Sequence, residues 1–262
     1  MAAPASGGPL QVAREPFDRW VRELEARHLA QLRFAEVARA LRALSSAYVE
    51  RRHRLRQGAA LDTAGKRAAF ALFYGPLHWL TVTPIVRTLD HGRTPIQTIV
   101  DLGCGTGAAG AAWALEACAS RVFGVDRHPW AVAEAGWTYR AAGVRGTARR
   151  GDLTRARLPG RNTAILASFA VNELDASARS VLEHRLLDAA GAGARVLIIE
   201  PISRPVCPWW DEWAAAFEVR GGRSDEWRLT VTLPLLLERL DRAAGLNHRT
   251  ITARSLWLNG SP

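Results

Sequence analysis

The chain has 262 residues, which is enough for one large α/β domain with an extension, and its formal net charge is +10 at pH 7. Its three cysteines, Cys104, Cys118 and Cys207, show neither metal-ligand spacing nor a disulfide framework, which argues against a secreted scaffold and favours a reducing, cytoplasmic compartment. The basic balance favours an anionic partner such as RNA.

The first third of the chain is expected to be a basic, helical extension. We expect residues 1–12 to be a disordered tail, residues 13–92 to form the extension, and residues 93–262 to form the main domain. Up to residue 67 the chain has thirteen basic and seven acidic residues, so the extension is its basic end. Such a surface fits either a solvated helical face or an RNA-binding patch.

Hydrophobic periodicity predicts several helices within this extension. The apolar stripe of the first helix changes face near residue 33, which predicts a bend or break there. Ser45-Ser46 interrupts the pattern, and a short basic helix over 48–57 should follow. A further helix should begin at a cap formed by Asp62 or Thr63 and should break or kink at Gly75-Pro76.

One uncharged run, residues 68–86, is long enough to raise the question of a membrane span. It contains two prolines, a glycine, a histidine and several hydroxyl side chains, which is poor material for a span. No membrane partner is therefore expected.

From residue 96 onwards, strand and helix patterns alternate. Strands are expected at 96–102, 121–126, 144–149, 163–168 and 195–200, with helices between most of them. Alternation of this kind predicts a parallel sheet with right-handed crossovers. Beyond residue 200 we expect an aromatic amphipathic helix over the ligand edge of the sheet, a helix over 233–244, and a closing antiparallel hairpin over 246–258.

The stretch over residues 98–110 carries the clearest functional signal. An apolar, β-branched run ends in Asp101, passes through glycines at positions 103, 105 and 107, and enters a helix of small residues. Glycines at this spacing allow a tight turn close to a ligand, and the helix behind them presents unpaired N–H groups. This pattern is typical of a nucleotide-type cofactor loop between a strand and a helix.

Two cofactor classes fit such a loop. The glycines at 105, 107 and 110, with Asp126 following, satisfy the dinucleotide fingerprint. Asp101 argues against a pyrophosphate, because its charge would oppose a phosphate and would suit a cationic amino acid moiety. A further acid, Asp152, follows the next strand. The three acids would then lie at the carboxyl ends of neighbouring strands, which is the usual ligand edge of an open α/β sheet.

Three segments in this order, 100–107, 122–126 and 151–153, resemble the motif set of class I S-adenosylmethionine-dependent methyltransferases. The resemblance implies a Rossmann-like, seven-stranded, mostly parallel sheet of order 3-2-1-4-5-7-6, with S-adenosyl-L-methionine as the cofactor. In that family the glycine loop lies under the methionine part of the cofactor. The acid matching Asp126 takes the ribose hydroxyls, and the acid matching Asp152 accepts from the adenine amino group.

The resemblance also supplies candidate site residues. In this family a helix before the glycine strand often closes one side of the pocket, which points to Tyr74 and His78, whereas core packing explains Trp79 better. The implied cofactor-binding residues are Tyr74, Asp101, Gly103, Cys104, Gly105, Thr106, Gly107, Asp126, Arg127, Asp152, Leu153, Ser168 and Phe169.

The acceptor side is less defined. Residues 168–174 stand where acceptor-side residues sit in this family, but the Asn/Asp-Pro-Pro-aromatic signature of enzymes that methylate amino groups of bases is missing. Methyl transfer from a sulfonium has no obligatory catalytic residue. Glu173 is the first candidate for a general base and His78 the second, while Glu173 and Asn172 fit equally well as caps of the next helix.

Two features bear on the acceptor class. Trp209, Trp210 and Trp213 could roof an apolar pocket, which favours a small-molecule acceptor. Residues 66–74 and 168–174 are similar to a methyltransferase-like family associated with small ribosomal subunits. That resemblance implies rRNA or a small-subunit component as the partner, bound through the Arg-rich extension, for an enzyme or for a non-enzymatic assembly factor. Members commonly carry several cysteines after the fifth strand that bind an iron–sulfur cluster; only Cys207 stands there, so that role is not implied.

Overall fold

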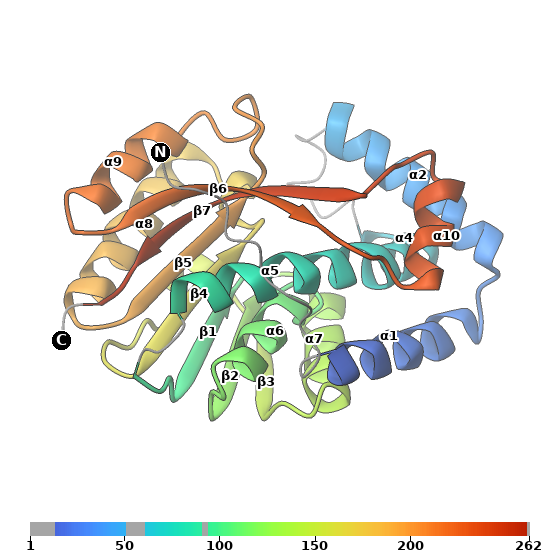
Figure 1. Ribbon diagram of the computed structural model, residues 1–262, viewed down its shortest axis with the longest axis horizontal. Coiled ribbons are helices and arrows are strands. Elements are labelled where there is room, and N and C mark those ends of the chain that lie inside the picture. Colours follow the sequence, from blue (N-terminus) through green and yellow to red (C-terminus); the bar gives the residue numbers. More distant parts are fainter. Residues whose placement is uncertain (1–13, 51–60, 91–93, 261–262) are drawn as a thin grey trace.

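The computed structural model describes residues 14–50, 61–90 and 94–260. Its centre is a seven-stranded sheet of order β3-β2-β1-β4-β5-β7-β6 (Figure 1). The strands are β1 (Thr98–Leu102), β2 (Arg121–Asp126), β3 (Gly146–Arg150), β4 (Thr163–Ser168), β5 (Arg195–Glu200), β6 (Arg223–Thr230) and β7 (Thr250–Leu258). The first five are parallel, and β7 runs antiparallel to β5 and β6. The predicted fold class and strand order are confirmed.

Helices cover both faces of the sheet because neighbouring residues of its central strands point into different apolar clusters. Ile99 belongs to the cluster on one face and Val100 to the cluster on the other. The first cluster takes side chains from α1 (Arg14–Leu29), α2 (Phe34–Glu50), α4 (Ala64–Ala69), α5 (Gly75–Asp90), α6 (Ala108–Glu116), α7 (Pro129–Ala141) and α10 (Leu235–Ala243). The second takes them from α8 (Ala176–Gly191) and α9 (Trp210–Glu218).

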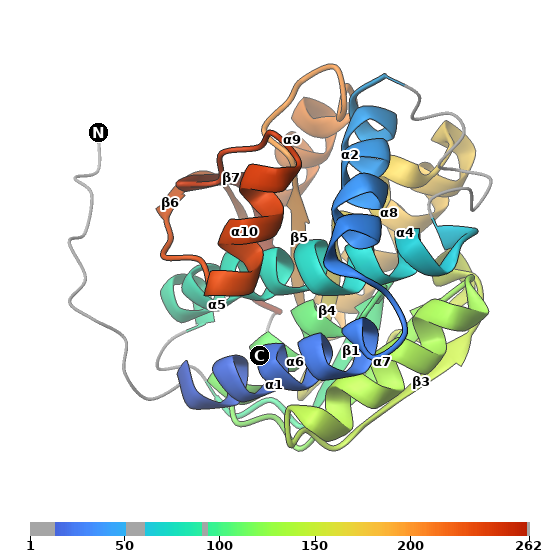
Figure 2. The ribbon, with the colours of Figure 1, turned by 90° about the vertical axis from the view of Figure 1, so that its right-hand side faces the viewer.

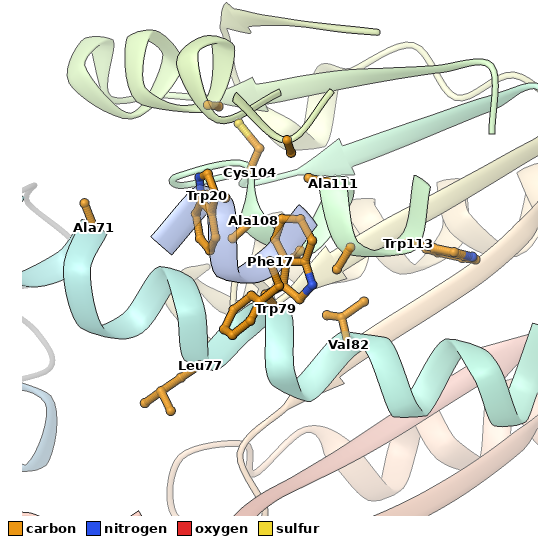
Figure 3. Packing of buried hydrophobic residues seen from close by; sticks show 14 of the residues in the cluster. Phe17, Trp20, Ala71, Leu77, Trp79, Val82, Cys104, Ala108, Ala111 and Trp113 are labelled. Atoms are coloured by element: carbon orange, nitrogen blue, oxygen red, sulfur yellow. The ribbon is translucent and has the colours of Figure 1, made fainter. Parts of the chain in front are cut away.

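The N-terminal helix α1 is built into the first of these clusters. Trp20 is fully buried, and its ring stacks on that of Trp79 in α5 with 5.0 Å between the ring centroids (Figure 3). The indole N–H of Trp20 donates to Thr138 Oγ1 of α7 over 3.3 Å. Trp79 is thus a core residue, as expected, and α1 shares one hydrophobic core with the sheet.

The helix boundaries of the N-terminal region agree with the sequence at one point and differ at another. The predicted break near residue 33 is confirmed, because α1 ends at Leu29 and α2 begins at Phe34. Ser45-Ser46 does not interrupt α2, which continues to Glu50. Serine costs little helix propensity, and the buried Leu41 and Leu44 hold this part of the helix in the core. The remainder of the predicted basic helix, residues 51–57, lies outside the described residues.

The helix that precedes the sheet is continuous from Ala64 to Asp90. α4 passes through a π-helical turn, η2 (Phe70–Tyr74), into α5 without interruption, so the predicted break at Gly75-Pro76 is wrong. In this turn the N–H of Gly75 donates to Phe70 O, five residues back. The N–H that Pro76 lacks therefore falls where the helix is already widened.

This long helix is apolar, but it is a core helix. Its 27 residues could cross a membrane by length and composition alone. However, 67% of its most apolar window is buried inside the protein. Its apolar side chains therefore pack inside the protein, chiefly against α6.

The C-terminal third departs most from the expected elements. Residues 250–258 form the single strand β7, which lies between β5 and β6 and pairs antiparallel with both, so the predicted hairpin within 246–258 is wrong. β6 is rich in charged and polar residues, so hydrophobic periodicity does not predict it as a strand. α10 lies between the two strands in sequence and beside α2 in space (Figure 2), where Arg42 donates to Ala243 O over 2.7 Å.

The tryptophan cluster does not roof a pocket. Trp209, Trp210 and Trp213 are buried and pack with Phe217 in the second cluster, under α8 and against β5 and β7. The rings of Trp209 and Trp213 meet edge to face with 4.7 Å between centroids. The expectation of an aromatic roof is therefore wrong, because the sheet itself covers the apolar side of α9.

Candidate active site

A cavity of about 890 Å³ lies at the carboxyl ends of the parallel strands. One part of its lining, which we call the strand-end wall, follows β1, β2, β3 and β4 and contains Asp101, Asp126, Asp152 and Ser168. A second part, which we call the helix wall, consists of Phe70, Tyr74 and His78 from the long helix and His248 from the loop before β7.

The structure brings nearly all of the candidate residues to this cavity. Among the cofactor-binding and general-base candidates named from the sequence, only Thr106 and Gly107 do not line it. Gly107 caps α6 in the left-handed region at φ +76°, and a Cβ there would lie 2.9 Å from Ala135 Cα and from the Tyr139 ring in α7. Thr106 is buried against α5, where a Cβ on Gly75 would lie 2.9 Å from Thr106 Oγ1. These two residues therefore fix the shape of the glycine loop through contacts with α5 and α7, without lining the cavity.

Asp101 is the most buried acid of the strand-end wall. Its Oδ2 accepts from the N–H of Gly110 over 3.1 Å, which ties the end of β1 to the first turn of α6. Burial raises the pKa of Asp101 from 3.8 to about 7, and the nearby charge of Asp126 acts in the same direction. The carboxyl group is therefore poised between its neutral and charged forms near neutral pH, and a cation beside it would favour the charged form.

The other two acids are held by local hydrogen bonds. Asp126 Oδ2 accepts from Gly105 N–H over 2.9 Å, and Oδ1 accepts from His128 N–H over 2.8 Å. Asp152 Oδ1 accepts from the backbone N–H and the hydroxyl of Thr154 over 2.8 and 2.7 Å, at the start of the short helix η3 (Leu153–Arg155). These bonds to the Thr154 side chain and backbone lower the pKa of Asp152, so it stays ionised.

Cys104 contributes a small side chain to the lining. Burial raises the pKa of its thiol well above the ordinary value, and the charges of Asp101 and Asp126 add to this shift. The thiol therefore stays protonated at neutral pH and is a poor nucleophile.

The helix wall is aromatic. The ring of His78 stacks on that of Phe169 with 4.7 Å between centroids and meets Phe70 edge-on. Burial lowers the pKa of His78 from 6.5 to about 4, so its imidazole is neutral at pH 7. Tyr74 Oη lies 3.2 Å from Ser45 Oγ of α2, and burial raises the pKa of Tyr74. The π-helical turn sets Phe70 and Tyr74 on the cavity side, which is where such turns are often found.

The loop after β4 is held in a strained shape. Phe169 has a φ of +56°, which is rare for a residue with a side chain, and its N–H donates to Ile199 O over 2.7 Å. Glu200, at the end of β5, accepts from the N–H groups of Val171 and Asn172 over 2.8 and 3.1 Å. It also accepts from the Asn172 side chain. Glu200 was not a sequence candidate, because nothing in the β5 motif distinguishes it from an ordinary strand end.

Glu173, the first sequence candidate for a general base, sits at the rim of the cavity. It ends the short helix η4 (Val171–Glu173), and its side chain is 37% exposed. Its carboxylate lies 3.4 Å from Arg127 Nη2. Asn172 lines the cavity as well, and its side-chain amide donates to Glu200.

His248 and its partner Asp241 were not among the residues predicted from the sequence. His248 lines the cavity, and its ring nitrogen Nδ1 lies 2.5 Å from Asp241 Oδ1 in α10. No signal in the sequence predicts this pair, because residues 246–258 were expected to form a hairpin, which would place His248 in a strand and not in the loop before β7.

Residues 99–188 match a protein family described as "Methyltransferase domain". Among solved structures with a similar fold is the N-methyltransferase NodS from Bradyrhizobium japonicum in complex with S-adenosyl-L-homocysteine, with 10% identity and a TM-score of 0.50 over 70% of this chain and 86% of that chain. The methyltransferase domain of bacterial CtHen1-C has 15% identity and a TM-score of 0.49 over 71% of this chain and 100% of that chain. No curated protein matches the chain.

A third similar structure is a geranyl diphosphate methyltransferase in complex with GPP and sinefungin, with 12% identity and a TM-score of 0.44 over 69% of this chain and 78% of that chain. At such identities these structures bear on the fold alone. The strand order and the family match define the class of protein, an α/β protein with the class I methyltransferase fold. Within that class, residues 99–188 are the part of the chain that matches methyltransferase domains.

Proposed function

We propose that this chain is a methyltransferase that uses S-adenosyl-L-methionine. The observation that carries the proposal is the strand-end wall, where Asp101, Asp126 and Asp152 line one cavity around a glycine loop. A buried acid beside the loop disfavours a pyrophosphate and favours a ligand with a positive charge. The NodS structure, with the same fold, holds S-adenosyl-L-homocysteine, the product form of this cofactor.

The polar atoms of the strand-end wall fit such a ligand. Asp101 Oδ1 has no hydrogen-bond partner among the described residues, so it can accept from an ammonium group. Ser168 Oγ is buried and likewise unpartnered within the described part of the chain. Buried polar atoms of this kind are costly unless a ligand or water satisfies them. Asp152 keeps Oδ2 available because Oδ1 takes both bonds from Thr154.

Each of the three carboxylates of the strand-end wall then has a distinct role. Asp101 pairs with the ammonium of the methionine part, Asp126 accepts from the ribose hydroxyls, and Asp152 accepts from the adenine amino group, as the resemblance implies. The bound cofactor supplies a methyl group that is already activated. What the chain adds is orientation of the nucleophile towards that methyl group and exclusion of water, for which the aromatic helix wall is suited.

The acceptor shares the cavity with the cofactor. A volume of about 890 Å³ is at the upper end of the range for small-molecule pockets, so it leaves room beside a nucleoside for a small acceptor or for one protruding group of a larger one. The net charge of +10 and the Arg-rich segment 51–56 favour RNA as a second candidate acceptor, including the rRNA of a small ribosomal subunit. That segment lies outside the described residues, so this candidate rests on sequence.

Calorimetry followed by label transfer tests the proposal. We expect the purified full chain to bind S-adenosyl-L-homocysteine and not NAD, and binding of NAD alone would overturn the proposal. Incubation with methyl-labelled cofactor and separate RNA, protein and metabolite pools should then label one of them. A chain that binds the cofactor but labels none of these pools would favour the non-enzymatic assembly factor over the enzyme.

A further inference from the structure

A carboxylate–imidazole pair lies at the C-terminal side of the helix wall. Asp241, in α10, is 5% exposed, and its two oxygens both face His248. Oδ2 accepts from the backbone N–H of His248 over 2.9 Å, and Oδ1 lies 2.5 Å from ring nitrogen Nδ1. The carboxylate therefore fixes both the loop and the ring of this histidine.

This arrangement determines which ring nitrogen is available. A carboxylate only accepts, so Nδ1 must carry a proton and donate it to Asp241. Nε2 makes no hydrogen bond within the part of the chain that the structure describes, so its lone pair is free. The His248 side chain is 32% exposed, and it lines the same cavity as Asp101, Asp126 and Asp152. Its ring rests edge-on against Phe73 of the π-helical turn, with 5.4 Å between centroids.

The two general-base candidates from the sequence lack these features. Glu173 is exposed at the rim of the cavity, and its carboxylate is already engaged by Arg127 Nη2 over 3.4 Å. His78 has no carboxylate to orient it among the described residues, and burial lowers its pKa to about 4. His78 therefore does not readily hold a proton taken from an acceptor at neutral pH.

We propose that His248 is the catalytic base of the transfer and that Asp241 is its positioning residue. This inference deepens the proposed function and rests on it. It assigns an acceptor whose attacking atom carries a hydrogen, an O–H or N–H group. The lone pair of that atom forms the new bond to the methyl carbon, and the carbon–sulfur bond breaks with its electron pair remaining on sulfur. The released proton moves to Nε2 of His248, where Asp241 stabilises the imidazolium, and then passes to solvent.

The first test reads the imidazole directly, without turnover. The full chain is labelled with ¹⁵N-histidine and studied by NMR with S-adenosyl-L-homocysteine bound, and His248→Gln assigns the signal. We expect the tautomer protonated on Nδ1 in the wild type. Asp241→Asn leaves one side-chain oxygen for two donors, so it should reduce that preference. A wild type protonated on Nε2 alone, or a signal unchanged by Asp241→Asn, would overturn the proposal.

The second test measures transfer with the pool that accepts the label. His248→Gln should lower kcat about 10²-fold or more, which is the usual contribution of a general base. Its affinity for S-adenosyl-L-homocysteine should stay within about twofold of the wild type. Asp241→Asn should lower kcat with little change in KM, and thermal unfolding of each variant checks its folding. The matched control is His184→Gln, which removes an exposed histidine in α8 that bonds to Ser180 O and should change nothing.

The outcomes separate this proposal from the one it rests on. A wild-type chain that fails to bind S-adenosyl-L-homocysteine would overturn both. If the wild type binds and transfers, but His248→Gln transfers at a similar rate, only the role of His248 is lost. The same holds if His248→Gln loses cofactor affinity in parallel with turnover, because the residue would then act in binding.

Discussion

The two walls of the cavity are built in opposite ways. The strand-end wall takes its three carboxylates from one stretch of sequence, residues 101–152, in which each acid lies at or just after the carboxyl end of one parallel strand. The helix wall joins rings from residues 70–78 to His248, near the other end of the chain. Backbone N–H groups hold the first wall, and packing between distant helices holds the second.

This difference indicates a division of labour. A wall made of strand ends and a glycine loop changes little when surrounding helices shift, which suits a ligand that is always the same. A wall assembled from a π-helical turn and a loop held by one carboxylate can be altered by a few side chains, which suits the acceptor side of the proposed reaction. The variants below should therefore affect cofactor binding at the first wall and leave it nearly unchanged at the second.

The largest expected effect is on stability and comes from Asp101. Its pKa in the folded protein is about 7, against an ordinary value of 3.8, so its contribution to stability is fully present below about pH 3.8 and is lost as the pH rises through 7. One pKa unit corresponds to about 1.4 kcal/mol, which bounds the loss at about 4 kcal/mol. Asp101→Asn should therefore unfold at higher urea than the wild type at pH 8, with the difference vanishing near pH 4.

A constant difference between the two proteins from pH 4 to 8 would contradict this account. Glu200 has a pKa raised to about 7 as well, mainly by burial, so the wild-type curve contains its contribution too. Because Glu200 is present in both proteins, the difference between them isolates Asp101. Urea unfolding at pH 4, 6 and 8 is sufficient for this measurement.

The sequence predicted the strand-end wall more completely than the helix wall. Asp101, Asp126 and Asp152 were found because each stands at or just after the carboxyl end of a predicted strand, in an order that matches a known set of motifs. His248 was not, because its role depends on where α10 ends in space and on Asp241 seven residues earlier. Periodicity also missed β6, whose residues are largely polar. Local motifs were therefore enough for the three carboxylates of the strand-end wall. At the helix wall the resemblance pointed to Tyr74 and His78, whereas only tertiary packing brings His248 to them.

The next effect concerns affinity at the strand-end wall. Asp101→Asn keeps an acceptor for the N–H of Gly110 but loses the charge facing the ligand, so S-adenosyl-L-homocysteine should bind about 10- to 100-fold more weakly at pH 8. 5′-Methylthioadenosine, which lacks the amino acid part, should bind both proteins equally. Asp188→Asn, an exposed change in α8, is the protein control. Calorimetry that found the same loss for both ligands would place Asp101 elsewhere than beside the ammonium group.

A smaller effect is expected at Asp152, which is exposed to solvent. Asp152→Ala should weaken S-adenosyl-L-homocysteine by about threefold, because solvent screens a hydrogen bond at this position. S-Inosylhomocysteine carries a carbonyl in place of the adenine amino group, so the same substitution should not weaken its binding. Equal losses of affinity for both ligands would show that Asp152 acts only by capping η3 through its two hydrogen bonds from Thr154.

The smallest effect on cofactor affinity is expected at the helix wall, where Tyr74 and Ser45 join the π-helical turn to α2. Their hydroxyl oxygens lie 3.2 Å apart, and a partly buried hydrogen bond of this kind contributes about 1 kcal/mol to stability. In a double-mutant cycle of Tyr74→Phe and Ser45→Ala, unfolding should give a coupling of that size. Both single variants should bind S-adenosyl-L-homocysteine within about twofold of the wild type, since the substitution at Tyr74 removes only the hydroxyl and keeps the ring that lines the cavity. A tenfold loss of affinity in Tyr74→Phe would mean that the phenol hydroxyl contacts the cofactor, and the two walls could then no longer be assigned to separate ligands.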